Sequence, residues 1–297
     1  MVSVIIPIYN EEKTIGTFLK TLEPVKGKAE IIFVDGGSTD ATLSLIPEDY
    51  RVLKSPKGRA RQMNLGADKS RGDVLFFLHC DSEIPQDAVE QIEHVMGKYQ
   101  AGCFGIAFHS KNIWMKCCQI ISNHRIKDRK VMFGDQGIFI RRRLFFQIGG
   151  FPELPIMEDY QFSLTLKEMG VKLGIAKKRI YTSDRRFVKG RRLQVMWQMN
   201  RLRAMYRKGV DIEEISKEEG QMALKLITDS ACDLPKKFAE EYGIEIIPTP
   251  LIIDGKDYFD GETIEAREFY HILREGREVS TYHINTYMFC RHFEKYA

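Results

Sequence analysis

The sequence predicts an α/β protein: a mostly parallel sheet covered by helices, followed by a small, partial α/β segment. From residue 1 to about 110, short apolar runs alternate with helical patterns, as in parallel sheets whose strands are joined by helices. Polar clusters follow three of these runs directly: "YNEE", "DGGSTD" and "CDSE". Because ligands of such sheets bind at the carboxyl ends of the strands, the three clusters predict a site at that edge.

Each element follows from local periodicity and from the residues that end it. In the first half we expect strands at 2–8, 29–35, 50–55 and 73–81 and helices at 11–22, 40–46 and 59–70. The middle section predicts helices at 111–130 and 157–170, a loop, strand, helix and turn within 133–151, and short strands at 171–176 and 178–183. A basic amphipathic stretch then covers 185–210, and 211–221 reads as a charged linker.

Composition indicates a soluble globular protein. Of the 297 residues 43% are hydrophobic and 29% charged, and no apolar run approaches the ~18 residues that span a bilayer. The N-terminal "MVSVIIPIYNEE" lacks a basic region and a small-residue cleavage site, so it is expected to be a strand and not a signal peptide. The six cysteines form no CxxC pair and no zinc-like spacing, which favours a reducing cytoplasm.

The net charge of +4 is unevenly distributed. Residues 221–297 contain 9 Lys/Arg and 14 Asp/Glu, whereas the preceding 220 residues contain 36 and 27. A basic excess of this size is compatible with anionic substrates or a membrane surface and is too weak to indicate nucleic acid. The change of character places a domain boundary at about 217–221, with domains at 1–217 and 222–297.

The segment "FFLHCDSEIP" runs an apolar strand into Asp81 and Glu83. Carboxylates at i and i+2 of an extended chain lie on one side, where they suit Mg²⁺ or Mn²⁺ with substrate phosphates as further ligands. Alternatively, they are polar residues that close a strand before a helix beginning near Pro85.

Further candidates follow the other strands. Asp35 could accept hydrogen bonds from a base or ribose, and Tyr9 offers a platform for a base beside Glu11. Lys57 and Arg59 offer positive charge to a diphosphate. The alternatives are a turn with a helix cap, a helix start after the first strand, and a solvated helix face.

Adjacent carboxylates in "PIMEDYQF" begin a predicted helix. The helix dipole favours Glu158 and Asp159 in a first turn, which is a purely structural account. The functional alternative is that one of them is a general base that accepts a proton from an incoming hydroxyl.

Taken together, these motifs resemble glycosyltransferase family 2, the inverting GT-A group that uses nucleotide-sugar donors. The resemblance covers residues 1 to about 217 and preserves the order of "PIYNEE", "VDGGSTD", "KGRARQMNLGA", "CDSEIP", "GGFPE" and "MED". It implies a GT-A fold and a sugar transfer that needs Mn²⁺ or Mg²⁺.

The resemblance also implies residue roles. It places Asp81 and Glu83 at the metal motif and Asp159 at the base. The nucleoside pocket and the diphosphate would be contacted by Pro7, Tyr9, Glu11, Asp35, Lys57 and Arg59. Two positions depart from the family pattern: Gly36 stands where Asp is common, and Glu83 replaces the usual second Asp.

Two interpretations of the basic segment 185–208 stay open. It could rest on an anionic membrane at the inner face and admit a lipid-linked acceptor, or it could pack on the catalytic domain with a solvated basic face. The acceptor itself is not determined by the sequence.

The C-terminal part resembles the beginning of the DegV-like fatty-acid-binding family. "TDSACDLP" and "IPTPLIIDGKDYFDG" carry this resemblance over 223–297. It implies a lipid contact near Thr281, although the neighbours of Thr281 differ from the family's usual "TSQIN". Met222 stands where a separate protein would begin, so we expect a fusion of two reading frames with the second one cut short. We also expect proteolytic cleavage near 211–221.

Two other functions stay open at this stage. A nucleotidyltransferase has a similar sheet and acidic metal ligands, although "PIYNEE" is not the Gly-rich phosphate loop that such enzymes carry. The other alternative is a lipid-binding or regulatory protein with an inactive transferase domain.

Overall fold

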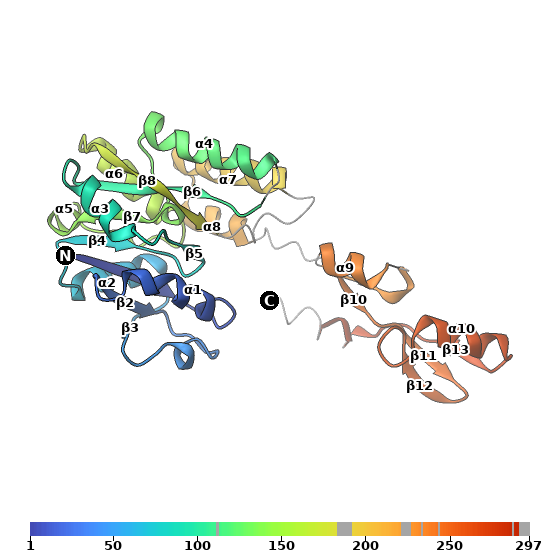
Figure 1. The fold of residues 1–297 in the computed structure, drawn as a ribbon. Coiled ribbons are helices and arrows are strands. Elements are labelled where there is room, and N and C mark those ends of the chain that lie inside the picture. Colours follow the sequence, from blue (N-terminus) through green and yellow to red (C-terminus); the bar gives the residue numbers. More distant parts are fainter. Residues whose placement is uncertain are drawn as a thin grey trace. The chain divides into compact units, whose positions relative to one another are not determined.

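The computed structural model describes residues 1–110, 113–182, 192–220, 227–232, 234–242, 244–286 and 288–290. Its internal contacts divide the chain after Lys217 into two compact units (Figure 1). Each unit is described by itself.

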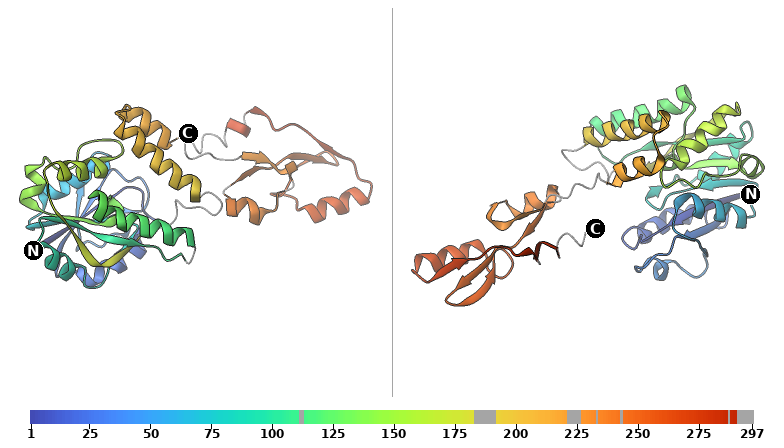
Figure 2. Two further views of the ribbon diagram at one scale, coloured as in Figure 1. Left: turned by 90° about the horizontal axis from the view of Figure 1, so that it is seen from above. Right: turned by 180° about the vertical axis from the view of Figure 1, so that it is seen from behind.

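The first unit is built on an eight-stranded mixed sheet in the order β3-β2-β1-β4-β7-β6-β8-β5 (Figures 1 and 2). β3, β2, β1 and β4 are mutually parallel, whereas β7 runs antiparallel to β4 and β6. The strands are β1 (Val2–Ile8), β2 (Ala29–Asp35), β3 (Arg51–Lys54), β4 (Val74–Phe77), β5 (Ser82–Glu83), β6 (Ala101–Ala107), β7 (Ile138–Arg141) and β8 (Leu173–Thr182).

Helices cover both faces of this sheet because the strands alternate their apolar side chains between the faces. In β1, Val4 and Ile6 face α1 (Ile15–Leu22) and α3 (Ala88–Met96). Ile5 belongs to the opposite core. The helices represented in that core are α2 (Arg59–Lys69), α4 (Ile113–Arg129), α5 (Arg142–Gln147) and α6 (Glu158–Glu168).

Two more helices complete the first unit. α7 (Arg192–Arg207) and α8 (Ile212–Gly220) pack against the beginning of α6. Leu202 of α7 and Ile215 of α8 are buried with Met157 and Tyr160. The expected linker at 211–221 is therefore wrong for 212–220, which form a helix because Ile215 has an apolar site to fill.

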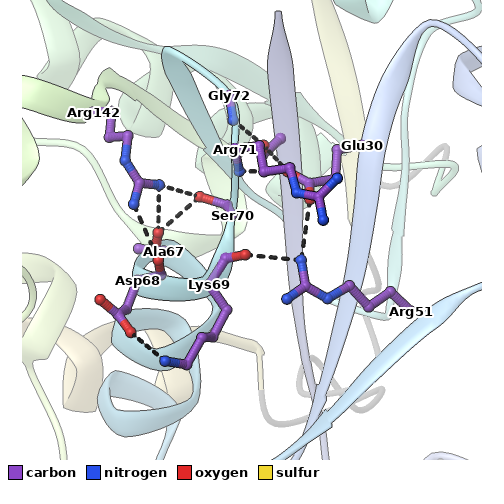
Figure 3. A network of polar contacts seen from close by, with 10 residues as sticks. Glu30, Arg51, Ala67, Asp68, Lys69, Ser70, Arg71, Gly72 and Arg142 are labelled. Carbon is purple, nitrogen blue, oxygen red and sulfur yellow. Dashed lines mark hydrogen bonds and ion pairs between the residues drawn. The ribbon is translucent and has the colours of Figure 1, made fainter.

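The end of α2 is held by a polar network (Figure 3). The Arg142 guanidinium donates to the carbonyl oxygens of Ala67 and Asp68 at 2.6 and 3.0 Å. Glu30 of β2 accepts from the Arg51 guanidinium at 3.2 Å and from the backbone N–H of Arg71 at 2.8 Å. The contacts of Arg142 satisfy carbonyl groups that a helix end leaves unpaired. Together with the contacts of Glu30, they hold the end of α2 beside β2.

Three further predictions need correction. Residues 40–46 form only a short 3-10 turn at Leu43–Leu45, because the Asp40 carboxylate accepts from both the backbone N–H and the hydroxyl of Thr42, which competes with helical bonding. The two strands predicted at 171–176 and 178–183 are one strand, β8, with a bulge. β4 stops at Phe77, before a turn at 79–82.

The second unit is small. β9 (Ile227–Asp229) pairs in parallel with β10 (Glu245–Ile247), and α9 (Lys236–Tyr242) lies between them in sequence. β11 (Pro250–Ile253) pairs antiparallel with β12 (Lys256–Phe259) and β13 (Val279–Thr281). Among the described residues of this unit, a small apolar core joins β11 to α10 (Ala266–Arg274) and contains four buried side chains: Leu251, Ile253, Ile264 and Ile272.

Candidate functional site

The loops after β1, β2 and β3 meet at the carboxyl edge of the sheet, as the sequence predicts for adjacent parallel strands. Asp35 ends β2 and is 2% exposed. Its carboxylate accepts the backbone N–H groups of Gly37 at 3.1 Å and Ser38 at 3.0 Å. Since a carboxylate has about four acceptor positions, Asp35 shapes its own loop and keeps capacity for another donor.

Tyr9 and Lys57 come together across this edge. The Lys57 ammonium lies 4.2 Å from the centre of the Tyr9 ring, a cation–π contact between the loops after β1 and β3. Pro7 lies within β1, opposite Val34. Glu11 donates its backbone N–H to the Thr42 hydroxyl at 2.7 Å, so these predicted donor residues share one edge.

Gln62, a residue that we did not single out in the sequence, lies beneath these loops. It is 4% exposed, and its amide nitrogen donates to the carbonyl oxygens of Ile8 at 2.8 Å and Val34 at 2.7 Å. A Cβ at Gly36 would lie 3.0 Å from the Gln62 side chain. Glycine at position 36 thus leaves room for the buried Gln62 amide, which joins β1 to β2.

The two predicted metal ligands lie in the turn and short strand after β4. Glu83, in β5, has a carboxylate oxygen 2.9 Å from the His109 imidazole, whose ring stacks on Tyr181. Asp81 immediately precedes β5. Within the part of the chain that the structure describes, no three His, Cys, Asp or Glu side chains form a metal-binding group. The carboxylate oxygens of Asp81 and Glu83 are ligands of the kind that Mg²⁺ or Mn²⁺ binds when substrate phosphates complete the coordination shell.

Glu158 begins α6 and is 1% exposed. Its carboxylate accepts a hydrogen bond from the Nε of Arg59. The predicted diphosphate ligand Arg59 therefore forms an ion pair with the glutamate of the "MED" motif. Burial raises the pKa of Glu158; the charge of Arg59 opposes this effect and that of Asp159 adds to it.

Asp159 is held by two backbone donors. Its Oδ2 accepts the N–H of Gly134 at 2.7 Å and its Oδ1 accepts the N–H of Tyr160 at 2.7 Å. A Cβ at Gly134 would lie 2.7 Å from the ring of His79 and 3.4 Å from Asp159 Oδ2. The carboxylate of Asp159 therefore adjoins the loop that leads from β4 to Asp81, and position 134 has no room for a side chain.

Asn64, which sequence reasoning missed, and Arg61 of the same helix explain the remaining motifs. Asn64 of α2 donates to the carbonyl of Phe151 at 2.8 Å and accepts its N–H at 2.9 Å. Arg61 pairs with Glu153 at 2.8 Å. The "GRARQMN" and "GGFPE" motifs thus contact one another, and the spacing "R-x-x-N" from Arg61 to Asn64, which places both side chains on one face of a helix, was the available signal.

Two predicted regions lie outside this edge. Thr281 is the exposed last residue of β13, where it pairs with Leu251; its lipid contact stays a prediction. Of the basic segment 185–208, residues 185–191 are outside the described residues, as is Met222. In α7, Leu202 is buried and Trp197 is 62% exposed. Among the described residues, no helix combines the length and apolar character needed to cross a bilayer.

Comparison with known proteins assigns the two parts of the chain. Residues 3–145 match the family model described as "Glycosyl transferase family 2", and residues 223–297 match that of the "Uncharacterised protein, DegV family". The first segment therefore resembles glycosyltransferase family 2 over the matched residues 3–145. Both resemblances stated from the sequence are confirmed.

The individual relatives agree with this division. The chain is 32% identical over 115 residues to a prophage bactoprenol glucosyl transferase homolog of Escherichia coli K12. This alignment covers 34% of this chain and 36% of the relative. It is also 39% identical over 71 residues to a DegV domain-containing protein of Caldanaerobacter subterraneus. These aligned residues make up 24% of this chain and 25% of the relative. The chain thus spans about a quarter to a third of these curated relatives.

A solved structure confirms the predicted fold. The mannosyltransferase PcManGT of Pyrobaculum calidifontis, in complex with GDP-Man and Mn²⁺, matches with a TM-score of 0.51 and 21% identity. The match covers 68% of this chain and 60% of that one. The glycosyltransferase family 2 segment therefore has the mixed, mostly parallel GT-A fold.

Proposed function

We propose that the first unit, residues 1–217, is a metal-dependent inverting glycosyltransferase that moves a sugar from a nucleotide-sugar donor to a hydroxyl acceptor. One observation carries this proposal. The N-terminus of α6 meets both the loop region after β4 and the beginning of α2, through Gly134 beside His79 and through the Arg59–Glu158 pair. A candidate base thereby adjoins the candidate donor site.

The donor would occupy the carboxyl edge of β1 to β4. A base near Tyr9 and a ribose near Asp35 would leave the diphosphate within reach of cationic side chains. Lys57 already lies over Tyr9, whereas Arg59 is engaged by Glu158. We therefore assign Lys57 the direct diphosphate contact and Arg59 the task of fixing α2 to α6. Pro7 and Glu11 would complete the nucleoside pocket.

Asp81 and Glu83 would hold Mn²⁺ or Mg²⁺ next to this diphosphate. A divalent cation bound there would neutralise negative charge on the departing nucleoside diphosphate. Because Glu83 replaces the usual second Asp of the motif, we assign Asp81 the main ligand role. The presence of Mn²⁺ in the structure of PcManGT supports a divalent metal.

Asp159 would act on the acceptor. Its two backbone hydrogen bonds fix the orientation of the carboxylate, and each oxygen retains a lone pair. The acceptor oxygen forms a bond to the anomeric carbon on the face opposite the diphosphate, the bond to the diphosphate breaks with its electron pair, and the hydroxyl proton passes to Asp159. Attack from the opposite face inverts the anomeric centre.

A lipid-linked acceptor at a membrane surface is part of the proposal. The Escherichia coli relative is a bactoprenol glucosyl transferase homolog, which supports an acceptor of this class. The exposed side chains of Ile120 and Ile121 on α4 and Trp197 on α7 offer apolar contact area, and α7 is rich in arginine. Apolar and basic side chains together favour peripheral binding to anionic lipid.

The decisive experiment is nucleotide release from a panel of UDP- and GDP-sugars with Mn²⁺, with and without acceptors. We expect slow release by the full chain from one donor class, abolished by chelation and restored by Mn²⁺. Release of pyrophosphate instead would indicate a nucleotidyltransferase. Fatty-acid binding without turnover of any donor would contradict the proposal and favour the regulatory alternative.

A further inference from the structure

Apart from the candidate site at the sheet edge, a cavity lies in the first unit among α4, α6 and α7. Its volume is about 190 Å³, which equals several water molecules at roughly 30 Å³ each. Ten residues line it: Arg125, Arg129, Val131, Phe133, Tyr160, Leu164, Lys167, Asn200, Arg203 and Arg207. None of the predicted donor or metal residues is among them.

The lining carries five cations and no carboxylate. Burial lowers the pKa of Arg125 to about 10, and the charge of Arg203 acts in the same direction, whereas the charges of Asp135 and Asp159, which do not line the cavity, oppose the shift. Burial also lowers the pKa of Arg203, to which the charges of Arg207 and Arg129 contribute. Like charges brought together in a partly desolvated space repel one another, so a bound anion would relieve this repulsion.

Aromatic rings hold the two central guanidinium groups in place. The rings of Phe133 and Tyr160 stack at 5.7 Å, and the guanidinium carbons of Arg125 and Arg203 lie 4.1 and 5.4 Å from the Phe133 ring centre. The Nε of Arg125 is buried and has no hydrogen-bond partner among the described residues. A planar guanidinium with an unused donor is suited to phosphate oxygens.

The cavity adjoins the candidate base. Tyr160 lines the cavity and directly follows Asp159, and Phe133 lines it and directly precedes Gly134, the backbone donor to Asp159. The charge of Asp159 also acts on Arg125. A molecule anchored in the cavity would consequently extend toward Asp159 from the α4, α6 and α7 side.

We propose that this cavity binds a phosphate monoester group of the acceptor and thereby brings the acceptor to Asp159. The number of cations favours a dianion over a carboxylate, and the cavity volume leaves room for atoms beside the phosphate. This inference rests on the proposed transferase function, because it names the class of acceptor for the same site.

The experiment measures binding to the full chain without donor or metal. Three probes present a phosphate monoester: inorganic phosphate, glycerol 3-phosphate, and phosphatidylcholine vesicles containing phosphatidic acid. Glycerol and vesicles containing phosphatidylglycerol, a phosphodiester, are the uncharged and the anionic controls. Arg125→Gln and Arg203→Gln each remove one lining charge, and Arg143→Gln removes an exposed charge on α5, outside the cavity.

We expect at least one monoester probe to bind, and both cavity variants to weaken its Kd about tenfold or more, since a charge-assisted hydrogen bond contributes on the order of 1.5–3 kcal/mol. Arg143→Gln should leave the Kd within about twofold. Binding only to phosphatidic acid vesicles identifies a lipid source, and binding of glycerol 3-phosphate identifies a soluble one. Circular dichroism establishes that the variants are folded, and Arg129→Gln replaces any variant that is not.

Two results would overturn the inference: no binding of any monoester probe by the unaltered chain, or equal weakening by Arg143→Gln. Its failure is separable from failure of the transferase proposal. A chain that releases nucleotide from a donor but binds no monoester loses only the cavity assignment. A chain that binds monoesters through Arg125 and releases no nucleotide keeps an anion site and loses the transferase function.

Discussion

At the residue scale, Asp159 is the position on which the proposed chemistry depends. Asp159→Asn keeps the size of the side chain and an acceptor oxygen for Gly134 while removing the proton acceptor. We expect transfer to fall by about 10²-fold or more and donor affinity to change by less than about twofold. Product formation and equilibrium donor binding measure the two effects. Full transfer by the variant would remove Asp159 from the mechanism.

The departure of Glu83 from the usual second Asp of the motif leads to a second residue-scale prediction. Asp81→Asn should raise the Mn²⁺ concentration for half-maximal nucleotide release more than Glu83→Gln, by about tenfold. The measurement is a Mn²⁺ titration of each variant at saturating donor. Equal shifts would mean that both carboxylates ligate the metal directly.

At the scale of elements, α2 organises the site. Arg59, Arg61, Gln62 and Asn64 contact α6, the turn before it and the ends of β1 and β2. Arg142 holds the opposite end of the helix. A single helix thus sets the distance between the donor edge and the candidate base, so changes in its orientation should affect both.

The network around Glu30 gives this arrangement a pH dependence. Burial acts to raise the pKa of Glu30, but hydrogen bonds from Ser3 and from the N–H of Arg71, with the charge of Arg51, outweigh it and lower the pKa. A lowered carboxyl pKa contributes stability that is present above the unfolded value of about 4.3 and is lost as pH falls through the folded value.

We therefore expect Glu30→Gln to reduce the free energy of unfolding by about 1–2 kcal/mol at pH 7 and by progressively less below pH ~4.5. Urea unfolding followed by tryptophan fluorescence reports on the first unit, because Trp114 and Trp197 are the two tryptophans of the chain. Glu48→Gln, at an exposed position, is the control. A difference that persists unchanged at low pH would contradict the assignment.

At the scale of the whole molecule, the two units differ in the size of their cores. Within its described residues the second unit has a small apolar core, whereas the first has large cores on both faces of its sheet. The part of α8 up to Lys217 belongs to the first unit, where Ile215 is buried beside Met157 and Tyr160. This placement moves the expected proteolytic site from 211–221 to the C-terminal side of Gly220.

Limited proteolysis with trypsin tests this revision. Cleavage after Lys217, within α8, should be slow in the native chain, and mass spectrometry should find first-unit fragments that end beyond Gly220. Ile215→Asp places a charge in an apolar site and should make Lys217 susceptible. Rapid cleavage after Lys217 in the unaltered chain would show that α8 is not docked.

Local patterns were sufficient for the central strands and for the motifs that follow them. β1 and β2 were predicted with their observed bounds because a continuous apolar run ended by polar residues is a local property of a buried parallel strand. The helix at 40–46 failed because Asp40 accepts hydrogen bonds from Thr42 and because both side chains are held there by the N–H groups of Glu11 and Glu12 in the loop after β1. Such partners are distant in sequence and leave no periodic signal.

Motif order and hydrophobic runs are properties of consecutive residues, so the resemblance to the two families, the strand-end location of the candidate site and its acidic residues could all be predicted before the fold was known. Only the tertiary structure decided that Arg59 pairs with Glu158, 99 residues away, that Gln62 joins β1 to β2, and that α4, α6 and α7 enclose a basic cavity. These features depend on which side chains of distant segments come into contact, and that is settled by packing of the whole unit.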